Sequence, residues 1–104
     1  MSRPRVPKRD ANHGEIVRTF EDMGCSVLDV SPLPGEALDL VVGCCGIDQR
    51  VECKNDAQPP NKRKLTASEA RTFDTWRGRP CVVVSSVDDA MRVVFLLRAE
   101  GTAR

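Results

Sequence analysis

One run of segments constrains the fold of this chain most. It consists of two strand-like segments joined by a short turn, followed by a helix and a single apolar strand. Residues 38–44 (LDLVVGC) and 49–55 (QRVECKN) flank a turn at CGID and predict a β-hairpin. A helical segment then leads to the uninterrupted run CVVVSS at residues 81–86, which is typical of a strand covered on both faces. Because a helical crossover returns the chain to a parallel strand, we expect a mixed sheet.

Patterned segments on either side of the hairpin complete an order α-β-β-β-α-β-α. Apolar residues recur at helical spacing from Ala11 to a stop signal at Gly24, and CSVLDV at residues 25–30 reads as a strand. Ser86 precedes a last helix over residues 87–99, with apolar residues at helical period, namely Val87, Ala90, Met91, Val94 and Leu97. These elements predict a three-layer α/β/α domain with helices on both faces of the sheet.

The helix between the hairpin and the apolar strand has a well-marked start. Thr66 and Glu69 have the spacing of a capping box, in which each side chain accepts a hydrogen bond from the other residue's backbone N–H. We expect this helix to end at Gly78, with Phe73 and Trp76 facing the core rather than serving as platforms for nucleic-acid bases.

The length and composition are those of one globular domain. A chain of 104 residues, with 40% hydrophobic and 30% charged residues, can bury one core without disulfides. Its five cysteines form no C-x-x-C pair, so we expect neither a zinc site nor a disulfide framework. We place the domain at residues 10–99, between a basic N-terminal arm (1–9) and a tail (100–104). With no long apolar run and no secretory signal, we expect a cytoplasmic location.

Three charged residues of the hairpin form a candidate site. Glu52 and Lys54 lie on one face of their strand, because side chains alternate along it. If the hairpin turns near Gly46, Asp39 lies diagonally close to Glu52, and a hard divalent cation such as Mg²⁺ or Mn²⁺ would relieve the repulsion of the two carboxylates. Such an ion beside a lysine is typical of a phosphodiesterase. The same residues would also suit a solvated strand face with a cross-strand ion pair.

The segment ALDLVVGCCGIDQRVECKND (37–56) resembles the core of the PD-(D/E)XK nuclease superfamily, in which an Asp on one hairpin strand and a (D/E)-x-K triplet on the next bind metal and cleave phosphodiesters. The continuation through QPPNKRKLTASE, WRG and CVVVSSVDDA is similar to small phage and bacterial proteins of the VRR-NUC or Holliday-junction-resolvase-like branch. The likeness covers residues 9–92. It implies a restriction-endonuclease-like core and a bacterial or phage-infected host cell.

The resemblance also implies a role for each site residue. Asp39 and Glu52 would be metal ligands, the backbone carbonyl of Cys53 would be a third ligand, and Lys54 would be the catalytic lysine. Glu15 corresponds to a helical acid that contacts the metal in related nucleases; its alternative is a solvated glutamate on the first helix.

Two positions depart from the pattern of these nucleases. Leu38 stands where the family usually has proline, a position that shapes the entry to the strand. Glu69 stands where relatives usually have glutamine, and as a substitute for a residue that contacts DNA or water it would add negative charge near the phosphate. We favour the capping role for Glu69, because helix capping explains it more simply.

Basic residues gather in two places although the net charge is only +1. One cluster is in the loop after the site strand, Lys62, Arg63 and Lys64, and the other is in the arm, Arg3, Arg5, Lys8 and Arg9. Either cluster suits a solvated surface, or contacts with a phosphate backbone that give salt-dependent, mostly sequence-independent binding. We expect His13 to be a surface residue of the first helix and not a catalytic base.

The leading expectation is a Mg²⁺-dependent DNA endonuclease that acts on branched or structured DNA as a homodimer or higher homo-oligomer. The apolar segment VVFLLRA would supply the interface between copies or close the core. The alternatives are a nicking or end-processing nuclease on simple DNA, and a nucleic-acid-binding module of the same fold without catalysis.

Overall fold

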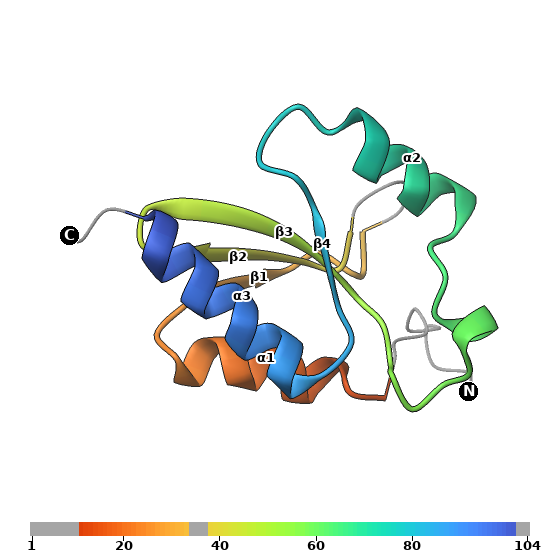
Figure 1. The fold of residues 1–104 in the computed structure, drawn as a ribbon, viewed down its shortest axis with the longest axis horizontal. Helices are drawn as coiled ribbons and strands as arrows, with labels where there is room; N and C mark the ends of the chain where they lie inside the picture. The colour runs from red at the N-terminus through yellow and green to blue at the C-terminus, as the bar shows by residue number, and fades with distance from the viewer. Residues whose placement is uncertain (1–10, 34–37, 102–104) are drawn as a thin grey trace, which may run out of the picture.

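The computed structural model describes residues 11–33 and 38–101 and has the expected order of elements (Figure 1). The helices and strands, in chain order, are α1 (His13–Asp22), β1 (Ser26–Asp29), β2 (Leu40–Cys44), β3 (Ile47–Cys53), the short 3₁₀ helix η1 (Pro60–Lys62), α2 (Ala67–Thr75), β4 (Val82–Val84) and α3 (Val87–Glu100). The predicted arm at residues 1–9 and residues 102–104 of the predicted tail lie outside the described residues.

The four strands of the described residues form one mixed sheet, as the sequence predicted, and their order in it is β1-β2-β3-β4. The β1–β2 and β2–β3 pairs are antiparallel, and the β3–β4 pair is parallel because α2 carries the chain across the sheet between them. The chain is therefore a mixed α/β domain with three helices.

The β2–β3 hairpin turns through two residues rather than four. Cys45 and Gly46 have φ values of 57° and 79°, and two successive left-handed residues make the tight turn that matches the twist of paired strands. As a result β3 begins at Ile47, whereas the sequence pattern placed its start at residue 49.

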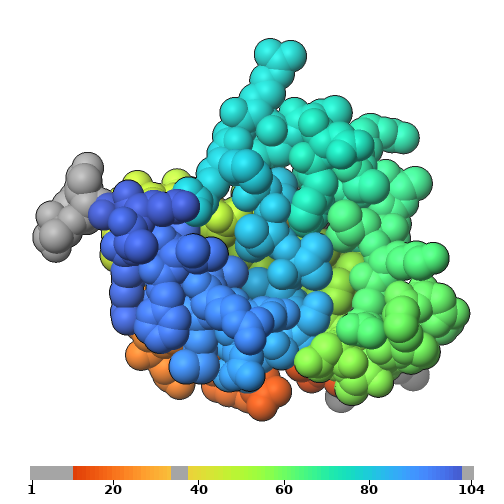
Figure 2. Space-filling view, in the orientation of Figure 1, coloured from red at the N-terminus to blue at the C-terminus, as the bar shows by residue number. Residues whose placement is uncertain are grey.

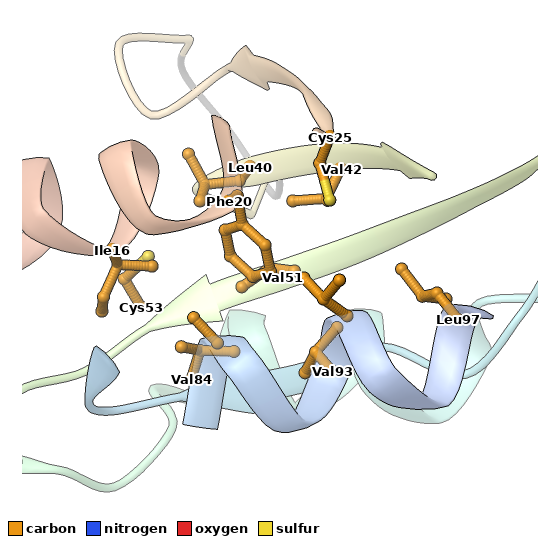
Figure 3. Packing of buried hydrophobic residues seen from close by; sticks show 12 residues of the cluster. Ile16, Phe20, Cys25, Leu40, Val42, Val51, Cys53, Val84, Val93 and Leu97 are labelled. Atoms are coloured by element: carbon orange, nitrogen blue, oxygen red, sulfur yellow. The ribbon is translucent and has the colours of Figure 1, made fainter. Parts of the chain in front are cut away.

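One face of the sheet carries the hydrophobic core, beneath α1 and α3. Figure 3 shows Phe20 of α1 and Val93 and Leu97 of α3 packed against Val51 and Leu40 of the central strands. All five side chains are at most 9% exposed. The alternation along β3 places Val51 and Cys53 in this core and sends Arg50 and Glu52 to the opposite face.

The opposite face of the sheet is more open than the sequence predicted. Among the helices of the described residues only α2 lies on that side (Figure 1), and Thr72 is its one buried residue. Val82 and Val84 of β4 pack toward the core, but Val83 between them is 40% exposed, so the prediction of a strand covered on both faces is wrong. The chain then projects from the surface between α2 and β4, at residues 76–81 (Figure 2).

Two further predictions of buried apolar residues are wrong. Helix α2 ends at Thr75, before Gly78, and Trp76 is 43% exposed, because its ring stacks on the Arg50 guanidinium of β3 and not in the core. Met91 on α3 is also exposed, since α3 turns Ala90, Val93, Val94 and Leu97 toward the core.

The ends of α3 are fixed as its sequence indicates. The Ser86 hydroxyl accepts a hydrogen bond from the Asp89 N–H at 3.1 Å, which caps the first turn. The helix continues through Glu100, and Gly101 lies against the hairpin turn, where an added Cβ would come within 2.5 Å of the Cys45 carbonyl oxygen. Within the described residues no helix has both the length and the apolar character that crossing a bilayer requires.

Candidate active site

The hairpin register brings the two predicted acidic ligands together. Leu40 pairs with Val51 at the end of the β2–β3 ladder, so the next residue on each side places Asp39 beside Glu52. The Glu52 side chain is 5% exposed, and it shares a hydrogen bond with Asp39. The predicted proximity of these two carboxylates is therefore present in the structure.

Asp39 also contacts the backbone of Cys53, whose carbonyl was predicted to be the third metal ligand. The Cys53 N–H donates to Asp39 Oδ2 at 2.8 Å. In an extended strand the N–H and C=O of one residue point to the same side, so the Cys53 carbonyl also faces the side of Asp39. The Cys53 side chain belongs to the core cluster, and its sulfur lies within 4.8 Å of an Asp39 carboxylate oxygen.

Lys54 follows directly after β3, and its ammonium group lies between two acids. Its Nζ donates to Glu69 Oε1 at 2.9 Å and lies 3.5 Å from Glu52 Oε2. The residue is 8% exposed. A lysine buried this deeply keeps its charge only if it is paired, and these two carboxylates supply the pairing.

Glu69 belongs to this site as well as to a helix cap. Its Oε1 accepts a hydrogen bond from the Thr66 N–H at 2.8 Å, and its own N–H donates to Thr66 Oγ1 at 3.2 Å, so the predicted capping box is present. The same oxygen accepts from Lys54. The capping role that we favoured for Glu69 is confirmed, and the same carboxylate oxygen also accepts a hydrogen bond from the lysine of the candidate site.

The crowded acids shift one another's protonation. Burial, the hydrogen bond with Glu69 and the charge of Asp39 raise the pKa of Glu52 to about 9. Burial works in the same direction on Glu69, but the Thr66 N–H and the contacts with Glu52 and Lys54 hold the pKa of Glu69 below its usual value. At neutral pH without a cation, Glu52 therefore carries a proton that it shares with its neighbours.

Contacts with carboxylates also keep Lys54 protonated. Burial acts to lower its pKa, but the hydrogen bond and charge of Glu69, followed by those of Glu52, hold the pKa of Lys54 above its ordinary value. The lysine is thus a fixed positive charge at the edge of the acid pair.

The donor set near Asp39 and Glu52 fits a hard divalent cation. Two carboxylates and a carbonyl on one side of the strand ends are oxygen ligands of the type that Mg²⁺ and Mn²⁺ use. Burial and the neighbouring carboxylates Glu69 and Asp39 raise the pKa of Glu52, and a bound cation would favour the charged form of this carboxylate.

His13 is buried, so its prediction as a surface residue is wrong. It is 3% exposed, and its Nε2 lies 3.0 Å from Asp29 Oδ2 at the end of β1. Ligand atoms of His13, Asp39 and Cys53 all lie within 4.8 Å of one another. The expectation of no zinc site stays a prediction.

Asn12 joins the start of α1 to the site strand. Its side-chain Nδ2 donates to the backbone carbonyls of Lys54 at 3.1 Å and Ser85 at 2.8 Å. Asn12 occupies the N-cap position of α1, but its side chain makes no capping hydrogen bond. The long-range contact has no local sequence signal, since its partners lie 42 and 73 residues away.

The remaining predicted residues are less closely connected to this cluster. Glu15 lies on the exposed side of α1, and no hydrogen bond or ion pair within residues 11–33 and 38–101 joins its side chain to the acids. In the loop after β3, Lys62 and Lys64 are exposed and Arg63 is half-buried. Lys8 and Arg9 lie outside the described residues.

Comparisons with known proteins do not extend this picture. No protein-family model, curated protein or solved structure matches the chain.

Proposed function

We propose that this protein is a Mg²⁺-dependent DNA endonuclease that hydrolyses phosphodiester bonds, with a preference for branched or structured DNA like that of Holliday junction resolvases. The convergence of Asp39, Glu52 and Lys54 at adjacent strand ends carries the proposal. A surface that only binds nucleic acid gains nothing from the buried Glu52 and the half-buried Asp39 facing a phosphate, because like charges repel. A restriction-endonuclease-like core is part of the proposal, supported by the hairpin and the crossover to a parallel β4.

Each residue has a role in the proposed hydrolysis. Asp39, Glu52 and the Cys53 carbonyl would hold Mg²⁺ or Mn²⁺, which lowers the pKa of a bound water and polarises the phosphoryl group. Lys54 stays protonated beside them and stabilises negative charge on the phosphoryl oxygens. Glu69 positions Lys54 through the 2.9 Å hydrogen bond.

The surroundings of the site supply binding surface for a phosphate backbone. Lys62, Arg63 and Lys64 follow the site strand by fewer than a dozen residues, and two of the three are exposed. Arg63 is also unusual in having a buried Nε that lacks a hydrogen-bond partner among the described residues. Contacts from these cations would give affinity without sequence readout, which suits an enzyme that recognises DNA structure.

Cleavage of both strands of a junction requires two active sites, so the proposal includes a homodimer. Val93, Val94 and Leu97 of helix α3 close the core, which is one of the two purposes considered for this apolar segment, while Phe95 and Leu96 are 54% and 57% exposed. The exposed pair would contribute to the dimer surface.

The test compares cleavage of a supercoiled plasmid and a synthetic four-way junction in Mg²⁺, Mn²⁺ or EDTA. We expect metal-dependent cleavage that favours the junction and falls at least about 100-fold in Asp39→Asn and Lys54→Ala. Asp48→Asn is the matched control, because Asp48 is an exposed carboxylate on the same hairpin, near the turn and away from the acid pair.

The outcomes separate the alternatives. Equal nicking of both substrates would support a nuclease for simple DNA. Metal-independent binding without cleavage of either substrate would overturn the nuclease proposal and leave a binding module. Glu15→Gln in the same assay decides whether the helical acid contributes, since a solvated glutamate would leave the rate unchanged.

A further inference from the structure

Trp76 is an exposed aromatic side chain that the structure nevertheless holds in one orientation. It is the C-cap residue of α2, where its N–H donates to the Thr72 carbonyl at 3.0 Å, and it is 43% exposed. The Arg50 guanidinium carbon lies over the indole, 4.1 Å from the ring centroid. One face of the ring is thus covered by a cation, in a stacking arrangement that fixes the plane of the indole.

Gly78 lies against the edge of the Trp76 ring. A Cβ at this position would lie 2.8 Å from Trp76 Nε1, closer than real Cβ contacts allow. The WRG sequence therefore has a physical explanation: the glycine leaves room for the indole to lie back over its own chain. Trp76 is confined on two sides, by Arg50 and by Gly78, although no hydrophobic core covers it.

The ring lies on the same side of the sheet as the acid pair. Arg50 and Glu52 alternate to the same face of β3, about 7 Å apart along the strand. Arg50 pairs across the hairpin with Val41, and Glu52 pairs with Val83 of β4, which is 40% exposed. The face beside the acids is therefore open and partly apolar, with Trp76 near its margin.

The charges around Trp76 are suited to a polyanion. Arg50 lies beneath the ring, and its Nε is buried without a hydrogen-bond partner in the described part of the chain. Arg77, the next residue, is exposed. An indole stacked on one arginine, with a second exposed arginine next to it in the sequence, combines a stacking surface with positive charge, which is how proteins bind single-stranded nucleic acid.

We infer that Trp76 is a stacking platform for an unpaired nucleotide of the DNA substrate, next to the proposed cleavage site. The inference rests on the proposed function. A base inside a duplex is already stacked on both sides, so an indole on the surface can receive only a base that is unpaired, flipped or at a strand end. Junctions, flaps and bubbles present such bases, whereas continuous duplex does not.

Intrinsic fluorescence tests the inference directly, because Trp76 is the only tryptophan and the chain has no tyrosine. The wild-type protein is titrated in EDTA, where metal-dependent cleavage is absent, with oligo(dT) and with a closed dumbbell duplex that has no unpaired ends. We expect oligo(dT) to quench the emission and the dumbbell to leave it nearly unchanged at the same bound fraction.

Labelled oligonucleotides give the affinities of the variants. Trp76→Leu should bind oligo(dT) about 5- to 100-fold more weakly, Trp76→Phe should keep part of the affinity, and neither should change binding to the dumbbell. Gly78→Ala retains the indole but displaces it, so it should weaken oligo(dT) binding with little loss of stability. Met91→Ala on α3 is the control, because Met91 is an apolar side chain of similar exposure (36%) on another surface.

The inference is overturned if Trp76→Leu binds oligo(dT) as the wild type does, if both DNAs quench equally, or if oligo(dT) does not bind. Junction cleavage in Mg²⁺ is measured separately. Cleavage by the wild type without selective quenching contradicts the stacking platform and leaves the nuclease proposal standing. Selective quenching without cleavage by any metal contradicts the nuclease proposal and supports the platform.

Discussion

Lys54 and Glu69 form a 2.9 Å ion pair that links the end of β3 to the first turn of α2. The Glu69 oxygen that accepts from Lys54 also accepts from the Thr66 N–H. Glu69 Oε1 therefore takes part both in the capping box and in the contact with Lys54. Substitutions can separate the contribution of the cap to stability from that of the Lys54 contact.

The first prediction concerns this shared carboxylate. Thr66→Ala removes only the hydroxyl of the cap and should lower the free energy of unfolding by about 1 kcal/mol. Glu69→Ala should cost about 2 to 4 kcal/mol, because it also leaves a buried ammonium with one partner fewer. Urea denaturation of both variants gives the two values, and equal losses would show that the Lys54 contact adds no stability.

Replacement of Glu69 by glutamine refines the same comparison. Glutamine can complete a capping box, so Glu69→Gln should keep most of the helix stability while removing the charge beside Lys54. We expect its stability to lie between that of the wild type and that of Glu69→Ala. A loss as large as that of Glu69→Ala would mean that the charge, and not the hydrogen bond, is the important feature.

The second prediction is a pH dependence of stability without divalent cations. The pKa of Glu52 is raised to about 9 from its ordinary value of 4.5, so the folded protein binds a proton that the unfolded chain releases. This stabilising contribution is complete below pH 4.5 and is lost as the pH rises toward 9. The free energy of unfolding should fall by on the order of 3 kcal/mol between pH 6 and pH 9.

Thermal melts in EDTA across this range measure the effect. Lys54 does not interfere, because its pKa is also raised and it stays charged throughout the window. The control is Glu52→Gln, which removes the titrating group and should flatten the profile. A wild-type profile that is already flat would contradict the raised pKa of Glu52.

The third prediction is that Mg²⁺ binding releases a proton. Glu52 is protonated at pH 7 when no cation is present, and a carboxylate must lose its proton to become a ligand. Calorimetric titrations in buffers with different ionisation enthalpies should report about one proton released per ion. Mg²⁺ should also raise the melting temperature, more at pH 8 than at pH 6.

Asp39→Asn and Asp48→Asn are the paired controls for this titration. The first should abolish both the proton release and the thermal shift, whereas the second should retain them. Binding of Mg²⁺ to the wild type without any proton release would mean that Glu52 is not one of its ligands.

The fourth prediction contrasts two glycines. In α1, Gly14 has room for a methyl group, since the nearest atom to an added Cβ is the Arg18 guanidinium at 3.5 Å. Gly14→Ala should raise the free energy of unfolding by up to about 1 kcal/mol. At Gly101 the added Cβ would meet the Cys45 carbonyl oxygen at 2.5 Å, and Gly101→Ala should cost about 1 to 3 kcal/mol. Equal effects of the two substitutions would contradict the close contact at the hairpin turn.

The sequence predicted best those features that depend on neighbours along the chain. The capping box of Thr66 and Glu69 needs only a spacing of three residues, and the closeness of Asp39 and Glu52 follows from a hairpin with a short turn. The element order and the mixed sheet follow from the same local patterns.

Burial of individual residues was predicted less well, because it depends on which surfaces meet. Val83 lies in an apolar run, yet no local pattern reveals that one face of the sheet carries only α2. His13 is polar and lies at the start of a helix, but Asp29 from β1 gives it a partner that makes its burial tolerable. The dual role of Glu69 depends on Lys54, 15 residues earlier, and was visible only as an alternative.

The sparse packing of α2 also has a dynamic consequence. Helix α2 buries one residue, whereas α1 buries three and α3 buries four. A helix with so few apolar contacts should open locally at a lower free energy than the sheet. We expect its amide protons to exchange with solvent well before those of α1 and α3. Each opening would release Lys54 from Glu69 while leaving Asp39 and Glu52 paired on the hairpin, so the lysine would be the most mobile member of the site.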